Sequence, residues 1–360
     1  MNRIEKYLAK EHGRKYCILV GNGTTAIYLS LVAQEFENNK IAIPNNVCMN
    51  VILPIYFSNN TPVFIDIEKE TLGLDINKMP KNEIISGMVA VHSYGNSCKI
   101  NEIVEYSKKN NIFLIEDAAV SQGGDYFSRK LGTFGEVAIL SFGPGKNINI
   151  GHGGAILLDS KDTYSVIREK LFELGSFSKN KEKQANFISK KHTKLYNIDF
   201  GKSLNRHHKE FKSLCLDNKS SFLYKFNEEF YGELESKLLK LDKYIEKRKE
   251  QSLYLKEKFQ GVEGVEILES INGSTYWRFN IFLEKYRDEL FLYLIGKKYK
   301  VSSWYHSIDL LFEKRESLYT PNSDWAGESV INIWVNEDVD KRYLDKISSD
   351  IVNFLGKKKC

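Results

Sequence analysis

The chemistry that the sequence suggests centres on Lys146, which lies in the glycine-rich segment LSFGPGKN directly after an apolar run typical of a strand. A tight turn that partly shields a lysine from water favours its neutral amine, which attacks carbonyl carbons to form imines. The segment is not a P-loop, because Leu140 stands five residues before Gly145 and Asn147 follows the lysine. The alternative interpretation is an exposed turn lysine without a chemical role.

A second segment, VGNGTTA from Val20 to Ala26, places two glycines and two threonines between a predicted strand and a predicted helix. Free N–H groups and partial positive charge at a helix start favour phosphate, and the hydroxyls of Thr24 and Thr25 can add hydrogen bonds. The spacing is not that of the dinucleotide-binding GxGxxG motif. A plain strand-to-helix turn with a threonine cap is the alternative.

A third segment places Glu116 and Asp117 at the end of the apolar run NIFLIEDAA. Open α/β sheets bind ligands at the carboxyl ends of their strands, so one of these carboxylates is a candidate ligand contact. A carboxylate there can pair with a protonated ring nitrogen of a cofactor. By itself, a helix N-cap is an equally good interpretation of the segment.

The composition is that of a globular protein of 360 residues, 42% of them hydrophobic. This length predicts two domains, and no apolar run approaches the length of a membrane helix. The N-terminal segment MNRIEKYLAKEHGRKYC is charged where an export signal is apolar, so we expect a cytoplasmic protein. A net charge of +5 with scattered lysines predicts neither a nucleic-acid nor a membrane partner.

The cysteines form neither CxxC pairs nor groups with histidine. We therefore expect free thiols in a reducing compartment, and no bound metal. The cysteines are Cys17, Cys48, Cys98, Cys215 and Cys360.

From about Lys15 to Leu158, short apolar segments alternate with segments of helical periodicity. This is the pattern of β-α-β units, and it predicts an open α/β fold with a mostly parallel sheet. The segments with helical spacing are TTAIYLSLVAQEF and INEIVEYSKKN. The predicted strands are YCILV, IAIP, TPVFIDI, GMVAVHSYG, NIFLIEDAA, VAILSFG and GGAILLD.

The rest of the chain is predicted in three parts. Residues 176–221 are polar, rich in lysine and asparagine and without clear periodicity, so we expect an atypical loop or insertion within a large domain of residues 1–227. Residues 228–259 have apolar positions at steps of three and four, which predicts one long amphipathic helix linking two domains. Residues 260–360 mix strand and helix patterns, as in a small α+β domain.

Seven segments occur in the order and spacing of a known family. They are GNGTTAIYLSL, IPNNVCMNVI, TPVFIDIEKETLGLDI, VHSYG, IEDAAVSQGG, LGTFGEVAILSFGPGKNINIGHGGAI and LLKLDKYIEKR. Together they resemble the DegT/DnrJ/StrS-type sugar aminotransferases, a branch of the fold-type-I pyridoxal-phosphate enzymes. The resemblance is dense from about Lys15 to Leu158 and sparse towards the C-terminus. Several motifs in register are more specific than any one of them. The resemblance implies a large domain with a mostly parallel sheet and a smaller C-terminal α+β domain.

The resemblance also implies roles for single residues, with pyridoxal 5'-phosphate as the cofactor. Lys146 stands at the Schiff-base lysine of the family's SFxxxK pattern, and Asp117 at the aspartate that pairs with the pyridine nitrogen. Cys48 stands at the position, often aromatic, that covers the cofactor ring. The residues at the positions that hold the cofactor phosphate are Thr24, Thr25 and Ser141.

The chain departs from the family pattern at several positions. Val120 replaces the glutamine of the family's DAAQ segment, which removes a hydrogen bond to the cofactor's phenolic oxygen, and Gln122 replaces a common histidine. The family's GYNYR segment sends an asparagine into the neighbouring subunit's phosphate site, and the alignment puts Leu223 at that asparagine. Either Lys225 or Asn227 takes its place, or the alignment shifts across the preceding segment. The resemblance implies a homodimer with shared active sites.

The implied reaction is amino transfer. An amino donor, expected to be L-glutamate, displaces Lys146 from the cofactor, and the freed lysine then moves a proton at the substrate α-carbon. The expected acceptor is a keto sugar, nucleotide-linked, of surface-polysaccharide or amino-sugar biosynthesis; a small phosphorylated ketone is the alternative. A dehydratase branch of the family has histidine in place of this lysine, which argues against a dehydratase. A catalytically inactive binding or regulatory homologue is the remaining alternative, motivated by the departures.

Aromatic and histidine side chains are candidates for the acceptor pocket. In proteins, such residues are more often packed side chains than ligand contacts. The candidates are His92, Tyr94, Trp304, Tyr305 and His306.

Overall fold

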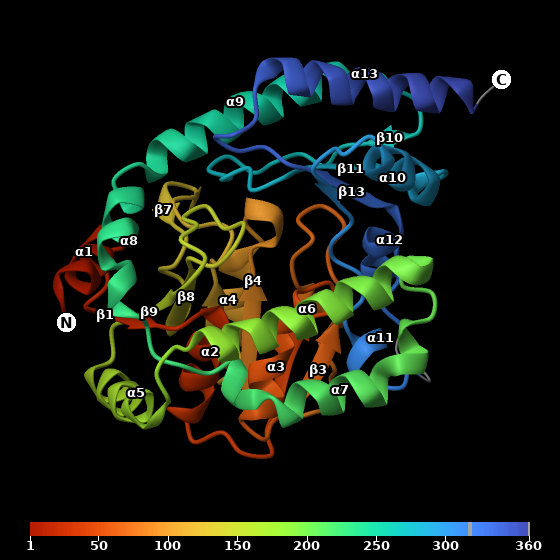
Figure 1. The fold of residues 1–360 in the computed structure, drawn as a ribbon. Coiled ribbons are helices and arrows are strands. Elements are labelled where there is room, and N and C mark those ends of the chain that lie inside the picture. Colours follow the sequence, from red (N-terminus) through yellow and green to blue (C-terminus); the bar gives the residue numbers. More distant parts are fainter. Residues whose placement is uncertain (316–318, 359–360) are drawn as a thin grey trace.

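The computed structural model describes residues 1–315 and 319–358, which form two main β-sheets flanked by helices (Figure 1). The larger sheet has the strand order β1-β9-β8-β5-β4-β2-β3. Neighbouring strands from β3 to β8 are parallel, whereas β9 is antiparallel to both neighbours. This confirms the predicted α/β fold with a mostly parallel sheet. The strands are β1 (Tyr16–Val20), β2 (Lys40–Pro44), β3 (Thr61–Ile65), β4 (Gly87–Val91), β5 (Phe113–Asp117), β8 (Val137–Ser141) and β9 (Gly154–Leu158).

Helices cover both faces of this sheet, which is why its strands are nearly continuous apolar runs. One face packs against α2, α3 and α5, and the other against α1, α4 and α8. No helix of the described residues is both long and apolar enough to cross a membrane. The bounds are α1 (Arg3–Glu11), α2 (Gly23–Val32), α3 (Met49–Phe57), α4 (Ile100–Lys109) and α5 (Lys161–Glu173), with short helices η1 (Ile76–Lys78) and η2 (Ser93–Gly95) and the ribbon β6 (Asp125–Tyr126) and β7 (Arg129–Lys130).

Residues 176–221 are largely helical, so the expectation of a loop is wrong. The long helix α6 crosses in front of the larger sheet in the view of Figure 1. Its buried side is a narrow stripe of Ile188, His192 and Tyr196, spaced four residues apart. Since one of the three is a histidine and the other faces are polar, a count of apolar residues misses the period. The helices are α6 (Lys179–Asp199), η3 (Leu204–His207), α7 (His208–Asp217) and η4 (Lys219–Ser221).

The single helix expected for residues 228–259 is also wrong, because the chain bends between α8 and α9 (Figure 1). The backbone of Lys240 has φ −110° and ψ 4°, outside the helical region. The two helices follow different surfaces: the Tyr231 hydroxyl on α8 accepts a hydrogen bond from Asn2 beside α1, whereas α9 packs beside α13. The elements are η5 (Glu228–Phe230), α8 (Tyr231–Leu238) and α9 (Leu241–Phe259).

The second sheet is antiparallel, with the strand order β10-β11-β13-β12. Its core is formed with α9, α10 and α13, and includes Leu255, Ile281, Ile331 and Ile347. The sheet lies within the predicted small domain, whose limits stay a prediction. The elements are β10 (Val265–Glu266), β11 (Phe279–Leu283), α10 (Arg287–Gly296), β12 (Val301–Ser302), α11 (Asp309–Phe312), α12 (Pro321–Ser329), β13 (Val330–Ile333) and α13 (Lys341–Lys357).

The adjacent carboxylates at the end of β5 face opposite sides of the sheet, as successive strand residues do. Glu116 is fully buried and forms an ion pair with His92 Nε2 at 3.0 Å. Burial disfavours the charged His92, but Cys98 and Glu116 outweigh it and raise the pKa of His92 to about 10. Burial likewise disfavours the charged carboxylate, but His92 and backbone N–H groups lower the pKa of Glu116 below its usual value. The carboxylate also accepts hydrogen bonds from the N–H groups of Gly132, Phe134 and Gly135.

We expect Glu116→Ala to lower the free energy of unfolding by about 3–5 kcal/mol, because it leaves a buried histidinium and three N–H groups without their acceptor. Denaturant unfolding at pH 7 measures this loss. The exposed Glu105→Ala on α4 is the control and should change stability by less than about 0.5 kcal/mol. Equal stability of the two variants would contradict the assigned network.

Candidate active site

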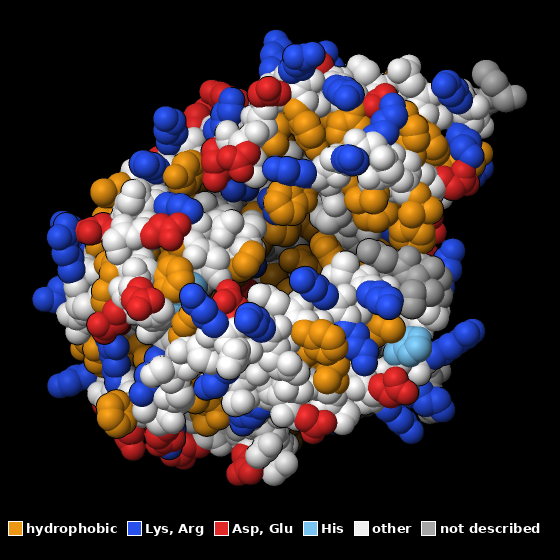
Figure 2. Space-filling model, viewed as in Figure 1, with side chains coloured by type: hydrophobic (Ala, Val, Ile, Leu, Met, Phe, Trp, Pro, Cys, Tyr) orange, Lys and Arg blue, Asp and Glu red, His pale blue; other side chains and the backbone are white. Residues whose placement is uncertain are grey.

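A cavity of about 390 Å³ lies at the carboxyl ends of the parallel strands, and Lys146 lines it. The space-filling view shows a hollow between α6 and the second sheet, with hydrophobic side chains in its depth and Lys or Arg side chains at its rim (Figure 2). Ends of β4, β5 and β8, and the loops after β1 and β2, form the cavity wall. The predicted site residues that line it are Thr24, Cys48, Tyr94, Asp117, Ser141, Lys146 and Tyr305.

The turn that carries Lys146 is held from the second sheet. Gly145 has φ +75°, a left-handed conformation that favours glycine. Its carbonyl accepts a hydrogen bond of 2.6 Å from the indole Nε1 of Trp277. The ammonium of Lys146 lies 6.0 Å from the centroid of the same indole ring. The backbone of this turn is therefore held by Trp277, and the ammonium of Lys146 lies beside the same indole in a residue that lines the cavity.

Asp117 lines the cavity as well and is almost fully buried. Burial raises the pKa of its carboxyl, and the charge of Lys146 together with the Ala119 N–H opposes this shift. The hydrogen bond from the Ala119 N–H to Oδ1 is 2.9 Å long. The carboxylate and the amine therefore act on each other within one cavity. Cys48 completes this part of the wall, and burial raises the pKa of its thiol.

The glycine turn after β1 opens α2 towards the cavity. Asn22 caps the helix, and its side chain accepts the Thr25 N–H at 2.8 Å. The N–H groups of Gly23 and Thr24 precede it in the first turn, where a helix has no acceptor of its own. Both residues line the cavity, as does Ser141. This end of the cavity therefore has the donors and the helix polarity that suit a phosphate.

Thr25, which we expected at the phosphate, does not line the cavity. Its buried hydroxyl donates to the carbonyl of Phe222 at 3.1 Å. The carbonyl of Tyr224 in turn accepts the Gly21 N–H at 3.0 Å. These bonds fasten the segment after η4 to the glycine turn, and its residues Ser221, Phe222 and Tyr224 line the cavity of their own chain.

The two candidates for the missing cross-subunit asparagine point elsewhere within this chain. The ammonium of Lys225 lies 4.7 Å above the ring of Phe172. Asn227 caps η5 by accepting the Glu229 N–H. Neither lines this chain's cavity, and a role for either in a neighbouring subunit stays a prediction. Leu223, which the alignment puts at the asparagine, is buried.

Two of the five candidates for the acceptor pocket line the cavity. The hydroxyl of Tyr94 donates to the Trp304 carbonyl at 2.5 Å and accepts the Tyr305 N–H at 2.8 Å. The rings of Tyr94 and Tyr305 lie 5.9 Å apart, centroid to centroid. Burial raises the pKa of both phenols, so both carry their protons at neutral pH.

The other three candidates are packed away from the cavity. His92 is held in the ion pair with Glu116. Trp304 packs on Tyr196 of α6 with ring centroids 5.1 Å apart. His306 lies next to His192, with their Nε2 atoms 3.4 Å apart. Nothing in the sequence separates such packed residues from ligand contacts, because side-chain direction is set by tertiary structure.

Further cavity residues have no counterpart among the predicted ones. Asn46 follows β2 and is buried, and neither polar atom of its amide has a hydrogen-bond partner within the described part of the chain. Its place after a parallel strand was a signal that could have found it. Helix α6 also contributes Glu182, Ala185, Asn186 and Ser189, which a segment taken for a loop could not reveal.

A profile of the DegT/DnrJ/EryC1/StrS aminotransferase family matches residues 1–352. The chain belongs to this family. Aminotransferases of this family use pyridoxal phosphate as their cofactor. The residues of this chain fit that group: an amine and a carboxylate line one cavity, and the start of α2, whose first N–H groups have no acceptor within the helix, lines it as well. Across residues 1–315 and 319–358, no group of three or more His, Cys, Asp and Glu side chains could hold a metal ion.

Among curated relatives of this family member, GDP-perosamine synthase of Escherichia coli O157:H7 is 30% identical over 167 residues, 46% of either chain. The dTDP-3-amino-3,6-dideoxy-alpha-D-galactopyranose transaminase of Aneurinibacillus thermoaerophilus is 33% identical over 143 residues, 39% of either chain. The aligned region thus spans less than half of these relatives. The solved structure of Helicobacter pylori PseC, an aminotransferase involved in pseudoaminic acid biosynthesis, has a TM-score of 0.78 at 17% identity, covering 98% of this chain and 90% of that one.

We expect Gly21→Ala to weaken the binding of pyridoxal phosphate by at least roughly tenfold, about 1.4 kcal/mol. A Cβ atom there would lie 2.3 Å from both the Tyr224 carbonyl oxygen and its ring, so the segment that lines the cavity must move. Titration of the apoprotein, followed by absorbance, measures the dissociation constant. Gly232→Ala on α8, whose Cβ would have no neighbour within 4 Å, is the matched control. Equal constants in the two variants would contradict this role of the segment.

The His192 and His306 pair predicts a loss of stability in acid. Burial lowers the pKa of His192 to about 4, and burial and then His192 lower that of His306 well below its usual value. Because the unfolded chain takes up these protons below pH 6.5 and the folded chain does not, the free energy of unfolding falls as the pH drops from 6.5 towards 4. The slope is about 1.4 kcal/mol per pH unit for each histidine.

Denaturant unfolding of the apoprotein between pH 8 and pH 5 tests this expectation. In His192→Gln the slope below pH 6.5 should decrease by about one proton. The comparison at pH 8, where both proteins have a neutral residue at this position, isolates the packing cost of the substitution. The same slope in both proteins would show that His192 does not resist protonation.

Proposed function

We propose that the protein is a pyridoxal-phosphate-dependent aminotransferase that transfers an amino group, from L-glutamate, to a nucleotide-linked keto sugar in polysaccharide or amino-sugar biosynthesis. The observation that carries this proposal is that Lys146 and Asp117 line one cavity bordered by the glycine turn of α2. Membership of the aminotransferase family supports the reaction type. The names of the two aligned relatives, a GDP-perosamine synthase and a dTDP-amino-sugar transaminase, support a sugar nucleotide as acceptor.

Pyridoxal phosphate, when bound, supplies an electron sink for negative charge at the α-carbon of an amino substrate. The side-chain amine of Lys146 would hold the cofactor and would accept and return the proton at the α-carbon of the substrate. The carboxylate of Asp117 would keep the ring nitrogen protonated, because water screens the attraction between opposite charges only weakly in a buried site. The N–H groups of Gly23 and Thr24 at the start of α2 would bind the phosphate. Tyr94 and Tyr305 line the same cavity as Lys146, so their rings take up space that water would otherwise fill.

The polar residues of α6 support a hydroxyl-rich acceptor. Asn186 and Ser189 line the cavity from this helix and offer an amide and a hydroxyl. A small phosphorylated ketone is the second candidate acceptor, and no contact of this structure favours it over a sugar. A cytoplasmic location and a homodimer with shared active sites also belong to the proposal. The location is supported by free cysteines, of which Cys17, Cys98 and Cys215 are buried.

An inactive binding homologue is the alternative of another class. The departures at Val120 and Leu223 motivated it, but both residues are buried among apolar side chains, and the lysine turn has its hydrogen bond from Trp277. A binding protein has no need of an amine and a buried carboxylate in one cavity. The presence of Lys146 likewise argues against a dehydratase. Spectroscopy separates the two classes before any acceptor is known.

We expect the protein loaded with pyridoxal phosphate to be yellow, and borohydride to remove this absorbance and attach the cofactor to Lys146, as seen by peptide mass mapping. L-Glutamate should bleach the colour in wild-type protein. Asp117→Asn should keep the cofactor but slow this bleaching by roughly two orders of magnitude or more, because the ring nitrogen loses its anionic partner. Lys146→Ala should fold normally and show neither the borohydride product nor turnover.

The exposed Asp162→Asn on α5 serves as the matched control and should bleach at the wild-type rate. A colourless protein that cannot be loaded with the cofactor would overturn the proposed function. A fully active Lys146→Ala variant would overturn the assignment of the lysine. A loaded protein that L-glutamate does not bleach would remove glutamate as the donor.

A further inference from the structure

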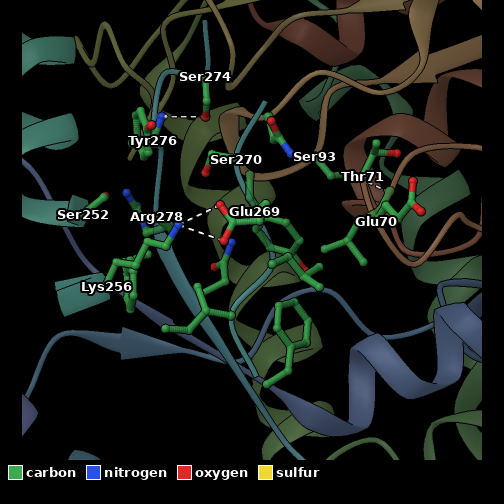
Figure 3. Close-up of a pocket in the computed structure, with 18 of the residues that line it drawn as sticks. Glu70, Thr71, Ser93, Ser252, Lys256, Glu269, Ser270, Ser274, Tyr276 and Arg278 are labelled. Atoms are coloured by element: carbon green, nitrogen blue, oxygen red, sulfur yellow. Dashed lines mark hydrogen bonds and ion pairs between the residues drawn. The ribbon is translucent and has the colours of Figure 1, made fainter. Parts of the chain in front are cut away.

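A second cavity, of about 220 Å³, lies between the two sheets next to the candidate active site. Residues after β4, including Ser93 and Tyr94, line both cavities. Figure 3 shows Ser252, Lys256 and Arg278 on one side of the second cavity, and Glu70 and Thr71 on the other. Ser252 and Lys256 come from α9, Arg278 directly precedes β11, and the other two come from the loop after β3. Both sheets therefore contribute to its wall.

The carboxylates of this cavity already have cationic partners. Glu269 pairs with Lys256 through both oxygens, at 2.8 and 2.7 Å. Glu70 lies 3.3 Å from the ammonium of Lys99. Arg278 is different: within the chain as described, no carboxylate lies within 4 Å of its guanidinium. Its charge is the one in this cavity wall that no anion balances at close range.

The contacts of Arg278 are neutral. Its Nη1 donates to the Trp277 carbonyl at 2.7 Å and its Nη2 lies 3.5 Å from the Gly145 carbonyl. The guanidinium is sandwiched between two indoles, 4.2 Å from the centroid of Trp277 and 3.9 Å from that of Trp334. These contacts hold the group in place and orient it, but they do not neutralise it.

Two buried polar atoms of the cavity wall have no hydrogen-bond partner among the described residues. They are Nε of Arg278 and Oγ of Ser252, in side chains that are 6% and 3% exposed as residues. A buried donor without an acceptor costs free energy, and a buried charge without a counterion costs more. Burial and the neighbouring Arg248 lower the pKa of Arg278 to about 9, so it is still charged at neutral pH.

We propose that the cavity between the sheets binds a small carboxylate, with Arg278 as its charged donor and Ser252 as a neutral one. A carboxylate accepts from both groups and removes the uncompensated charge, and hydrogen bonds between ions are the strong ones. A cavity of 220 Å³ is below the range of drug-sized sites and suits a molecule the size of an amino acid. A dicarboxylate of five carbons is a suitable probe.

The indole of Trp277 contacts both this site and the turn that carries Lys146. Trp277 contacts the guanidinium of Arg278 on one side and holds the Gly145 carbonyl, while the Lys146 ammonium lies 6.0 Å from its centroid. The carboxylate can thus come from two sources: the amino donor itself, or a separate effector that acts on the lysine turn. The donor source rests on the proposed function, whereas the site itself does not.

Calorimetric titration of the purified protein with glutarate tests the site, because glutarate lacks the amino group and cannot react. We expect saturable binding that weakens at least tenfold in Arg278→Gln and several-fold in Ser252→Ala. Ser213→Ala, on the exposed side of α7, is the control and should bind like wild type. Circular dichroism and thermal unfolding check the fold. Ser252→Ala removes only an unpartnered hydroxyl, so it decides the question if Arg278→Gln does not fold.

No saturable binding at millimolar glutarate, or equal affinity in wild type and the folded variants, would overturn the proposal. The rate of bleaching by L-glutamate then separates the sources: competitive inhibition by glutarate indicates the donor's carboxylate, and inhibition or activation without competition indicates an effector. If glutarate binds through Arg278 but glutamate never bleaches the protein, glutamate transamination fails and the carboxylate site stands.

Discussion

The hydrogen bond from the Trp277 indole to the Gly145 carbonyl connects the two sheets at the point where the chemistry is expected. Gly145 belongs to the turn after β8 in the larger sheet, and Trp277 precedes β11 in the smaller one. The Gly145 carbonyl lies outside the strands of the larger sheet, so the hydrogen bonds between those strands do not hold it. The second sheet therefore does more than cover the cavity, because the orientation of the turn that carries Lys146 depends on its position.

Much of the cavity wall comes from segments that lie far apart in sequence, and the open edge of the larger sheet explains why. Parallel strands bring their carboxyl ends to one edge, but they leave that edge open. Three other segments line the cavity at this edge. They are Phe222 and Tyr224 next to the glycine turn, the helix α6, and Tyr305 from the segment after β12. The contacts that hold these segments include the backbone hydrogen bond from Gly21 to Tyr224 and the ring contact between Tyr94 and Tyr305.

Much of the fold could be predicted from the sequence because strand patterns are local. All seven predicted strands of the larger sheet are present, and the family prediction is confirmed over residues 1–352. Lys146 and Asp117 were candidates because a glycine turn and a strand end are visible in sequence, and the resemblance to the family supplied their expected roles. The structure places both in the wall of one cavity, and their roles stay predictions. The direction of single side chains could not be predicted from the sequence. Thr25 donates to the Phe222 carbonyl, and His306 lies next to His192. The sequence also missed α6, whose buried stripe is one residue wide and includes a histidine.

The departure at Val120 shows how a changed contact can leave the surrounding structure in place. Its side chain is apolar and buried, so it offers no hydrogen bond to a ligand. Its carbonyl, however, accepts the hydroxyl of Thr275 at 3.0 Å and the amide of Asn147 at 3.2 Å. These bonds tie the segment after Asp117 to the loop that precedes β11 and to the residue that follows Lys146. The backbone that positions the aspartate and the lysine relative to each other therefore does not depend on which side chain stands at position 120. The apolar side chain of Val120 thus offers no hydrogen bond to the cavity that Lys146 and Asp117 also line, while its backbone carbonyl keeps both of these contacts.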